Sequence, residues 1–183
     1  MQNKIILLVL SIIFSSVSYA YDEQEYNYKL KHEDWIFTHR SRENTYHFEV
    51  GKKLWGTEYT YRYADLNGTI ENRIKFTTDL FSHGGFTLKG RTEYRNFDNE
   101  ESHWRWRFIA EYNPHLYGNL YLFTRIDPRW SFKDAGTAFD SRDQIGITYK
   151  ATSWRITPFL ERNSTEGYHM NQTVGGIHWE ANI

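Results

Sequence analysis

The chain contains no cysteine, and only three of its 183 residues are proline. Disulfides and thiolate metal sites are therefore excluded, and an exported domain of this size must be held by a packed core or a closed sheet. After the first twenty residues, no apolar run approaches the roughly 20 residues that a membrane-spanning helix needs. The net charge of −1 points to no charged partner and gives no sign of nucleic-acid binding.

The N-terminus has the features of a secretory signal peptide. Residues 1–20 combine a basic residue near the start, an apolar run from Ile5 to Phe14 and the small-residue ending SYA. This pattern predicts cleavage after Ala20, with an uncleaved anchor helix as the alternative. Residues 21–183 are then predicted to form one exported domain. If that domain spans a membrane, it must do so as a β-barrel.

The segment HWRWRFIAEY alternates aromatic with charged side chains. In an extended strand, Trp104, Trp106 and Phe108 lie on one face. Arg105 and Arg107 lie on the other face. A strand with lipid on one side shows this period of two, and so does a half-buried strand of a soluble sheet.

Similar alternation predicts ten strands. They lie within residues 25–38, 45–51, 57–64, 69–80, 86–95, 103–112, 120–133, 143–150, 154–161 and 172–183. Short connections such as GKK and ATS alternate with more polar ones such as NFDNEESH. Bacterial outer-membrane barrels alternate short periplasmic turns with longer external loops in this way. An even number of strands would place both ends of the domain in the periplasm.

The two faces of the predicted strands differ in composition. In this register the apolar face of the second to tenth strands carries no Lys, Arg, Asp or Glu. It is rich in aromatic residues near strand ends, among them Tyr63, Tyr94, Trp104, Tyr112, Tyr149 and Trp154. Aromatic belts at both ends are typical of barrels in a bilayer. The predicted fold is therefore all-β, an antiparallel transmembrane β-barrel in the outer membrane of a Gram-negative bacterium. A soluble periplasmic β-sandwich or lipocalin-like barrel is the alternative.

The opposite face carries basic side chains that would line the lumen. They are Arg62, Arg73, Arg91, Arg95, Arg105, Arg107, Arg125, Arg129 and Arg155. Arginine presents a planar fork that suits carboxylates and other oxyanions, so these residues predict a path for anions through a porin. Glu93, Glu111 and Asp127 share that face. If they neutralise the arginines, the barrel is a closed structural or adhesion protein instead. The charge pattern alone favours neither interpretation.

Other functions have little support in the sequence. The inward aromatic residues Tyr121, Phe123 and Phe159 would either stack on sugars or simply fill the lumen. A barrel enzyme is a further alternative, because Ser82 and His83 are adjacent. However, neither a G-x-S-x-G nor an H-E-x-x-H motif occurs. The protein is therefore predicted not to be an enzyme and to need neither a metal nor a cofactor.

Three segments resemble the KdgM family, the small monomeric outer-membrane porins for acidic oligosaccharides such as oligogalacturonate. YNYKLKHE resembles the family's first strand, WRITPFLERN its near-terminal Pro-aromatic-aliphatic-Glu strand and QTVGGIHWEANI its last strand. The resemblance implies a monomer in outer-membrane lipid that lets acidic oligosaccharides or other small anions diffuse along basic tracks. That role would fall on Arg91, Arg95, Arg105, Arg107, Arg125 and Arg129. Family members build twelve strands, and their usual terminal aromatic residue is Ile183 here.

Overall fold

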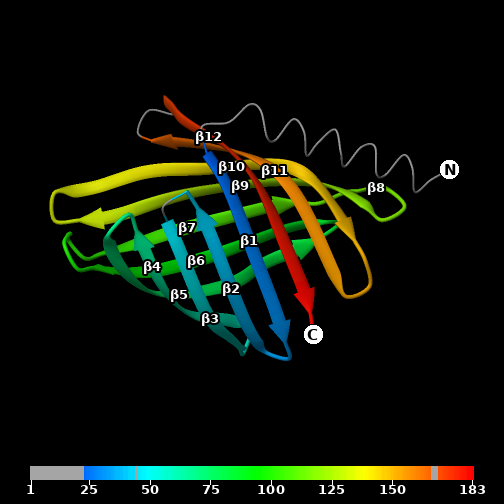
Figure 1. Cartoon of the computed structure of the whole chain (residues 1–183), viewed down its shortest axis with the longest axis horizontal. Helices are drawn as coiled ribbons and strands as arrows, with labels where there is room; N and C mark the ends of the chain where they lie inside the picture. Colours follow the sequence, from blue (N-terminus) through cyan, green and yellow to red (C-terminus); the bar gives the residue numbers. More distant parts are fainter. Residues whose placement is uncertain (1–22, 44, 166–168) are drawn as a thin grey trace.

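The computed structural model describes residues 23–43, 45–165 and 169–183 (Figure 1), so the predicted signal peptide and its cleavage site lie outside the described residues. The described residues form twelve strands: β1 (Glu23–His32), β2 (Trp35–Arg42), β3 (Thr45–Leu54), β4 (Thr57–Leu66), β5 (Thr69–His83), β6 (Phe86–Phe97), β7 (His103–Tyr112), β8 (His115–Tyr117), β9 (Leu120–Lys133), β10 (Gly136–Lys150), β11 (Trp154–Thr165) and β12 (His169–Asn182). Within the described ranges, no helix is both long and apolar enough to cross a membrane.

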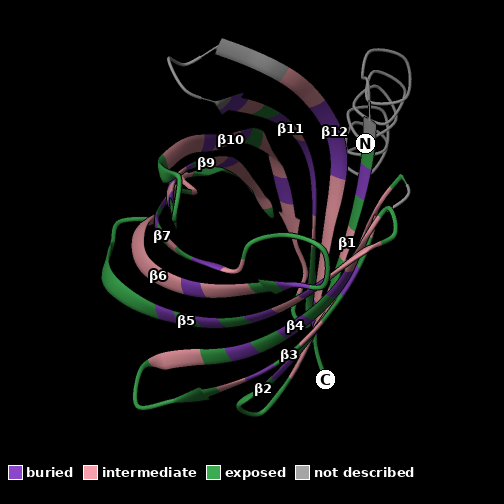
Figure 2. Cartoon of the chain, turned by 90° about the vertical axis from the view of Figure 1, so that its left-hand side faces the viewer, coloured by how far each residue is buried: buried purple, intermediate pink, exposed green. Residues whose placement is uncertain are grey.

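Eleven of these strands close into a barrel. Consecutive strands pair antiparallel from β1 to β7, then β7 pairs with β9 and the pairing continues to β12. β12 pairs with β1 to close the ring, and this seam is parallel. Among the described residues, the short β8 pairs only with the start of β9 and lies outside the ring. Figure 2 looks into the ring, with β9 to β12 above and β2 to β5 below.

The predicted all-β barrel is confirmed, but eleven strands replace the ten counted in the sequence and the twelve implied by the resemblance. The miscount lies in the first predicted strand, residues 25–38, which folds into β1 and β2 around a turn at Glu33 and Asp34. Glu33 adopts a left-handed φ of 50°, which bends the chain sharply. With an odd number of strands, β1 and β12 run in the same direction (Figure 1). The chain therefore enters and leaves the barrel at opposite ends.

The two ends of the barrel hold different connections. The end that we call the loop end holds the start of β1 and the connections β2–β3, β4–β5, β6–β7 and β9–β10. The turn end holds the connections β1–β2, β3–β4, β5–β6, β7–β9 and β10–β11, together with the C-terminus. The C-terminus, labelled in Figure 1, thus lies at the end opposite to the start of β1.

Side chains alternate between the outer surface and the lumen along each strand. Outward Trp106 is 55% exposed, whereas inward Glu93 and Asp127 are 0% exposed. The barrel therefore has an apolar outer surface around a charged interior, the reverse of an ordinary soluble fold.

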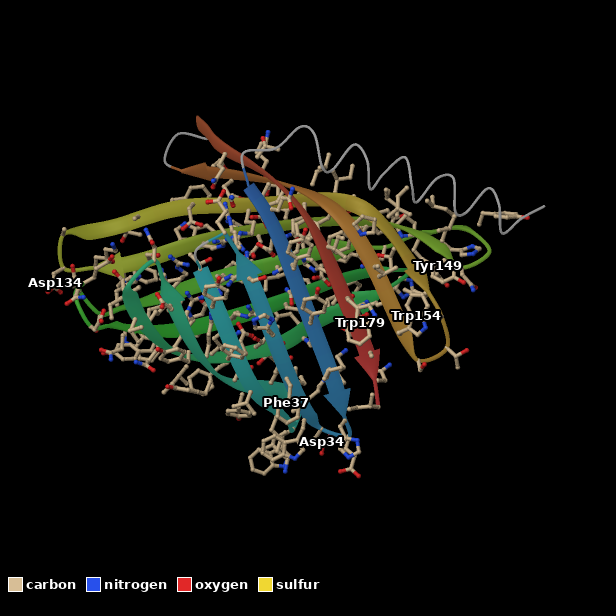
Figure 3. All side chains as sticks on the ribbon, in the orientation of Figure 1. Asp34, Phe37, Asp134, Tyr149, Trp154 and Trp179 are labelled. Carbon is tan, nitrogen blue, oxygen red and sulfur yellow. The ribbon has the colours of Figure 1, made fainter. Side chains whose placement is uncertain are left out.

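Outward aromatic rings contact one another across neighbouring strands near both ends of the barrel. Near the loop end, the ring centroids of Tyr94 and Trp104 lie 5.1 Å apart. Near the turn end, those of Tyr149 and Trp154 lie 5.6 Å apart, and Figure 3 labels this pair. Both pairs belong to the aromatic residues that the sequence places near strand ends.

The outer surface is not free of charge over its whole length, contrary to the prediction. Asp143 and Arg162 face each other on β10 and β11, on the same outward face as Ile145 and Leu160. Arg162 Nη2 lies 3.0 Å from Asp143 Oδ2. Asp143 lies in the middle of β10 and Arg162 three residues before the end of β11, so this ion pair interrupts the apolar surface there.

Candidate functional site

The lumen contains two cavities of similar size. The cavity at the loop end, which we call the vestibule, has a volume of about 520 Å³. Its wall contains two carboxylates, Glu43 and Glu71, and nine arginines: Arg40, Arg42, Arg62, Arg73, Arg95, Arg105, Arg107, Arg129 and Arg142. The cavity toward the turn end, the inner chamber, has a volume of about 500 Å³ and a mixed wall of twelve Lys or Arg and eight Asp or Glu side chains. The vestibule is thus the more basic of the two.

Four arginines separate the cavities. Arg40, Arg62, Arg107 and Arg142 line both the vestibule and the inner chamber, and we call them the arginine belt. They come from β2, β4, β7 and β10, which are distributed around the ring. A solute that crosses the lumen must pass these side chains.

All nine arginines predicted from the sequence line the lumen. Arg73, Arg95, Arg105 and Arg129 line the vestibule, Arg91, Arg125 and Arg155 line the inner chamber, and Arg62 and Arg107 line both. The sequence analysis missed Arg40, Arg42 and Arg142. It assigned them to segments outside the predicted strands, whereas β2 extends to Arg42 and β10 begins at Gly136. A period of two places Arg40 and Arg42 on the inward side with Thr38. Next to Arg142 the outward positions Ser141 and Asp143 are polar, so alternation gives no signal there.

Buried carboxylates connect the inward arginines into one network. Arg107 donates hydrogen bonds to Glu93 Oε1 at 2.8 Å and to both carboxylate oxygens of Asp127. Glu93 also accepts from Arg73 Nη1 at 3.1 Å, and Asp127 accepts from Arg125 Nη2 at 3.1 Å. We call this chain, which crosses β5, β6, β7 and β9, the ion-pair ladder. Glu111, the third predicted counter-charge, lies farther from its partners, 3.7 Å from Arg125 and 3.9 Å from Lys89.

The strand register explains why the ladder is needed. Arg91 and Arg129 both lie directly opposite Arg107, on the two neighbouring strands. Arg73 lies in the same way between Arg62 and Arg95. Like charges in these positions repel each other unless opposite charges lie between them. Glu93 and Asp127 supply those opposite charges around Arg107. Glu71, which pairs with both Arg73 and Arg95, supplies one for the second set.

One wall of the inner chamber is packed rather than open. Phe159 is 1% exposed, and its ring lies edge-on against His178 with centroids 4.1 Å apart. A ring this deeply buried offers no face on which a sugar could stack, so Phe159 fills the lumen. The ring of Tyr121 lies under Lys150 Nζ at 3.8 Å, and Phe123 is buried in the chamber wall.

Gly176 makes room for the buried ring of Phe159 next to the parallel seam. A Cβ atom at Gly176 would lie 2.5 Å from Phe159 Cζ and 2.8 Å from the backbone oxygen of Glu25. Replacing Gly176 by alanine should therefore destabilise the barrel by about 1–3 kcal/mol, measured as a lower midpoint of urea unfolding. Gly90→Ala is the control, because its new Cβ would meet only the flexible end of Leu80 at 3.3 Å. Equal midpoints for the two variants would contradict this packing. Adding Phe159→Leu to Gly176→Ala should restore only part of the loss, because the contact with the backbone oxygen of Glu25 remains.

The adjacent Ser82 and His83 lie at the turn end of the barrel. Ser82 and His83 are both exposed at the end of β5, and Ser82 Oγ lies 3.5 Å from Thr87 Oγ1. No group of three or more His, Cys, Asp or Glu side chains in the described ranges could hold a metal ion.

Comparison with known proteins identifies no relative: no family model, no curated protein and no solved structure matches the chain. The lumen itself is therefore the basis for assigning a function.

Proposed function

We propose that this chain is an exported outer-membrane β-barrel of a Gram-negative bacterium and that small anions diffuse through its lumen. The observation that carries the proposal is the vestibule lining, which contains nine arginines and two carboxylates. Each of these arginines also forms an ion pair with a carboxylate of the barrel wall. Rings of basic side chains select anions in pores. Acidic oligosaccharides are among the candidate solutes because the ends of the chain resemble the KdgM family.

The membrane location is supported by the outer surface. Apolar and aromatic side chains remain exposed along the outside, with ring pairs near both ends, as expected where a barrel meets the two bilayer interfaces. Connections of two residues join strands at both ends, so the predicted contrast between short periplasmic turns and longer external loops is not present. If the turn end is periplasmic, a solute from outside the cell meets the vestibule first.

A closed structural or adhesion barrel is the second candidate. The ion-pair ladder favours it, because Glu93 and Asp127 already have arginine partners in the middle of the lumen. The arginine belt between the two cavities favours it as well. The two candidates differ in whether ions cross the belt.

Conductance across a planar bilayer distinguishes the candidates. For an anion path, we expect steady channels whose reversal potential in a KCl gradient shows preference for chloride. Arg105→Glu should lower the chloride-to-potassium permeability ratio at least about twofold, because it reverses a charge in the vestibule wall. Arg105 is suitable because its only ion pair with a described residue is long, 3.8 Å to Asp140.

The matched control for this experiment is Arg162→Glu, which makes the same charge change on the outer surface. It should leave the permeability ratio unchanged. Folded protein that never conducts would reject the porin and favour the closed barrel. Equal effects of the two variants would mean that the selectivity does not arise in the vestibule.

A further inference from the structure

One edge of the Arg129 guanidinium lacks a hydrogen-bond partner in the vestibule wall. Arg129 is 7% exposed, and its Nη1 lies 3.1 Å from Asp140 Oδ1. The opposite edge consists of Nε and Nη2, and neither nitrogen makes a hydrogen bond to a described residue. Nε forms a long ion pair with Asp127 Oδ1 at 3.6 Å. That edge is the fork that binds two oxygens of a carboxylate, phosphate or sulfate. It is closed to solvent, so we expect the guanidinium to turn toward the cavity when an anion binds.

Further donors without acceptors come from β3 and β4. Arg62 Nη2 lies 3.0 Å from His47 Nε2. Since a guanidinium nitrogen can only donate, His47 Nε2 is the acceptor and the ring hydrogen is on Nδ1. Both His47 Nδ1 and Arg62 Nε are buried without a hydrogen-bond partner among the described residues, although Arg62 Nε lies 3.6 Å from Glu49 Oε1. The two side chains line the vestibule together with Arg129.

The unpartnered atoms of the vestibule wall share one property: all of them donate hydrogen bonds. They are His47 Nδ1 and both nitrogens of the Arg129 edge, together with Arg40 Nε and Arg62 Nε, whose side chains line both cavities. In the inner chamber, by contrast, the unpartnered atoms include the oxygen Gln144 Oε1. A buried donor without an acceptor is unfavourable, and a ligand that offers only acceptors would remove this cost in the vestibule.

From this arrangement we infer that the vestibule is a binding site for a tetrahedral oxyanion, the phosphate or sulfate group of a small solute. Such a group carries up to two negative charges and several acceptor oxygens, which matches a wall of nine arginines better than a single carboxylate does. The cavity of about 520 Å³ also has room for the rest of a small phosphorylated or sulfated molecule. The inference rests on the proposed anion path and names its solute class.

Calorimetric titration of the folded, full chain with inorganic phosphate tests the site. The protein should be held in lauryldimethylamine oxide micelles, which contain no phosphate, and inorganic sulfate and acetate should be titrated in parallel. We expect phosphate and sulfate to saturate one site at least about tenfold more tightly than acetate. Arg129→Gln should weaken phosphate binding about tenfold, whereas Arg162→Gln, the same change on the outer surface, should leave it unchanged.

Several outcomes would overturn the inference. Acetate binding as tightly as phosphate would mean that the wall attracts any anion, and full phosphate affinity in Arg129→Gln would place the site elsewhere. If Arg129→Gln does not fold, Arg129→Lys replaces it, since lysine keeps the charge but lacks the fork. A lysine variant that binds phosphate normally would reject a site built on the fork. Stronger competition by a short-chain phospholipid than by free phosphate would assign the site to a lipid headgroup and not to a solute.

This test is independent of the conductance experiment. Phosphate binding without conductance would keep the site and reject the porin. Anion-selective conductance without saturable phosphate binding would keep the porin and reject the site.

Discussion

Replacing Arg107 by glutamine should destabilise the barrel by about 3–5 kcal/mol, the largest loss that we expect from any single lumenal arginine. Arg107 joins two carboxylates, Glu93 and Asp127, that are both 0% exposed. Without its guanidinium each carboxylate loses a charged donor inside a confined interior, and water cannot replace that donor easily. Urea unfolding from lipid vesicles measures the loss.

Two further variants show whether the loss in Arg107→Gln comes from its buried ion pairs. Arg162→Gln removes the exposed ion pair with Asp143 and should cost no more than about 1 kcal/mol. Combining Arg107→Gln with Asp127→Asn should cost less than the sum of the two single variants, because the uncompensated carboxylate is then absent. If Arg107→Gln is as mild as Arg162→Gln, the ion-pair ladder does not stabilise the barrel.

The barrel fold could be predicted from the sequence because a period of two is a local signal. Each strand records, residue by residue, which side faces the surroundings and which faces the lumen, as HWRWRFIAEY illustrates. The first hairpin was missed because its turn contains only Glu33 and Asp34 and no glycine or proline. The polar residues of such a tight turn resemble the polar positions of one continuous strand. This single error changes the number of strands from even to odd. The closing pair β1 and β12 is therefore parallel and not antiparallel.

The sequence also predicted that these arginines point into the lumen, but it could not predict which carboxylates they contact. Alternation places Arg107 inward, yet its contacts with Glu93 and Asp127 depend on the registers of β6 with β7 and of β7 with β9. Register follows from the whole closed ring and from the turns, not from one strand. For the same reason, the sequence could not show which arginines have their donors satisfied and which, such as Arg129, do not.

A neutralised ion-pair ladder is compatible with a basic vestibule. Arg107 belongs to the ladder and also to the belt, so its charge is neutralised by Glu93 and Asp127. Arg105 and Arg129 lie on the vestibule side with fewer close carboxylate contacts. The ion-pair ladder would then hold the arginines of the vestibule in place. Whether the barrel is a pore or closed depends on the width of the lumen between the four arginines of the belt.

Two exposed tryptophans occupy different places on the outer surface, one within strand β7 and one in the turn between β3 and β4. Trp106 lies in the middle of that strand, is 55% exposed, and its ring contacts Phe132 at a centroid distance of 5.3 Å. Trp55 is 94% exposed at the tip of the turn between β3 and β4. If lipid surrounds the barrel, the first position lies in hydrocarbon and the second in water or among headgroups.

Trp106→Arg should therefore lower the stability of the barrel in lipid by about 2–4 kcal/mol, the cost of an arginine on the lipid side near mid-depth. Trp55→Arg makes the same chemical change at the turn end and should fold almost as well as the unaltered chain, since charges near the interface cost about 0–1 kcal/mol. The yield of folded protein in lipid vesicles, read from heat-dependent gel migration, compares the two variants. In a soluble barrel, outward Trp106 would face water, and an arginine there would be tolerated as easily as at Trp55. Equal folding of both variants would thus remove the membrane from the proposal, whereas selective failure of Trp106→Arg would place hydrocarbon around the middle of β7.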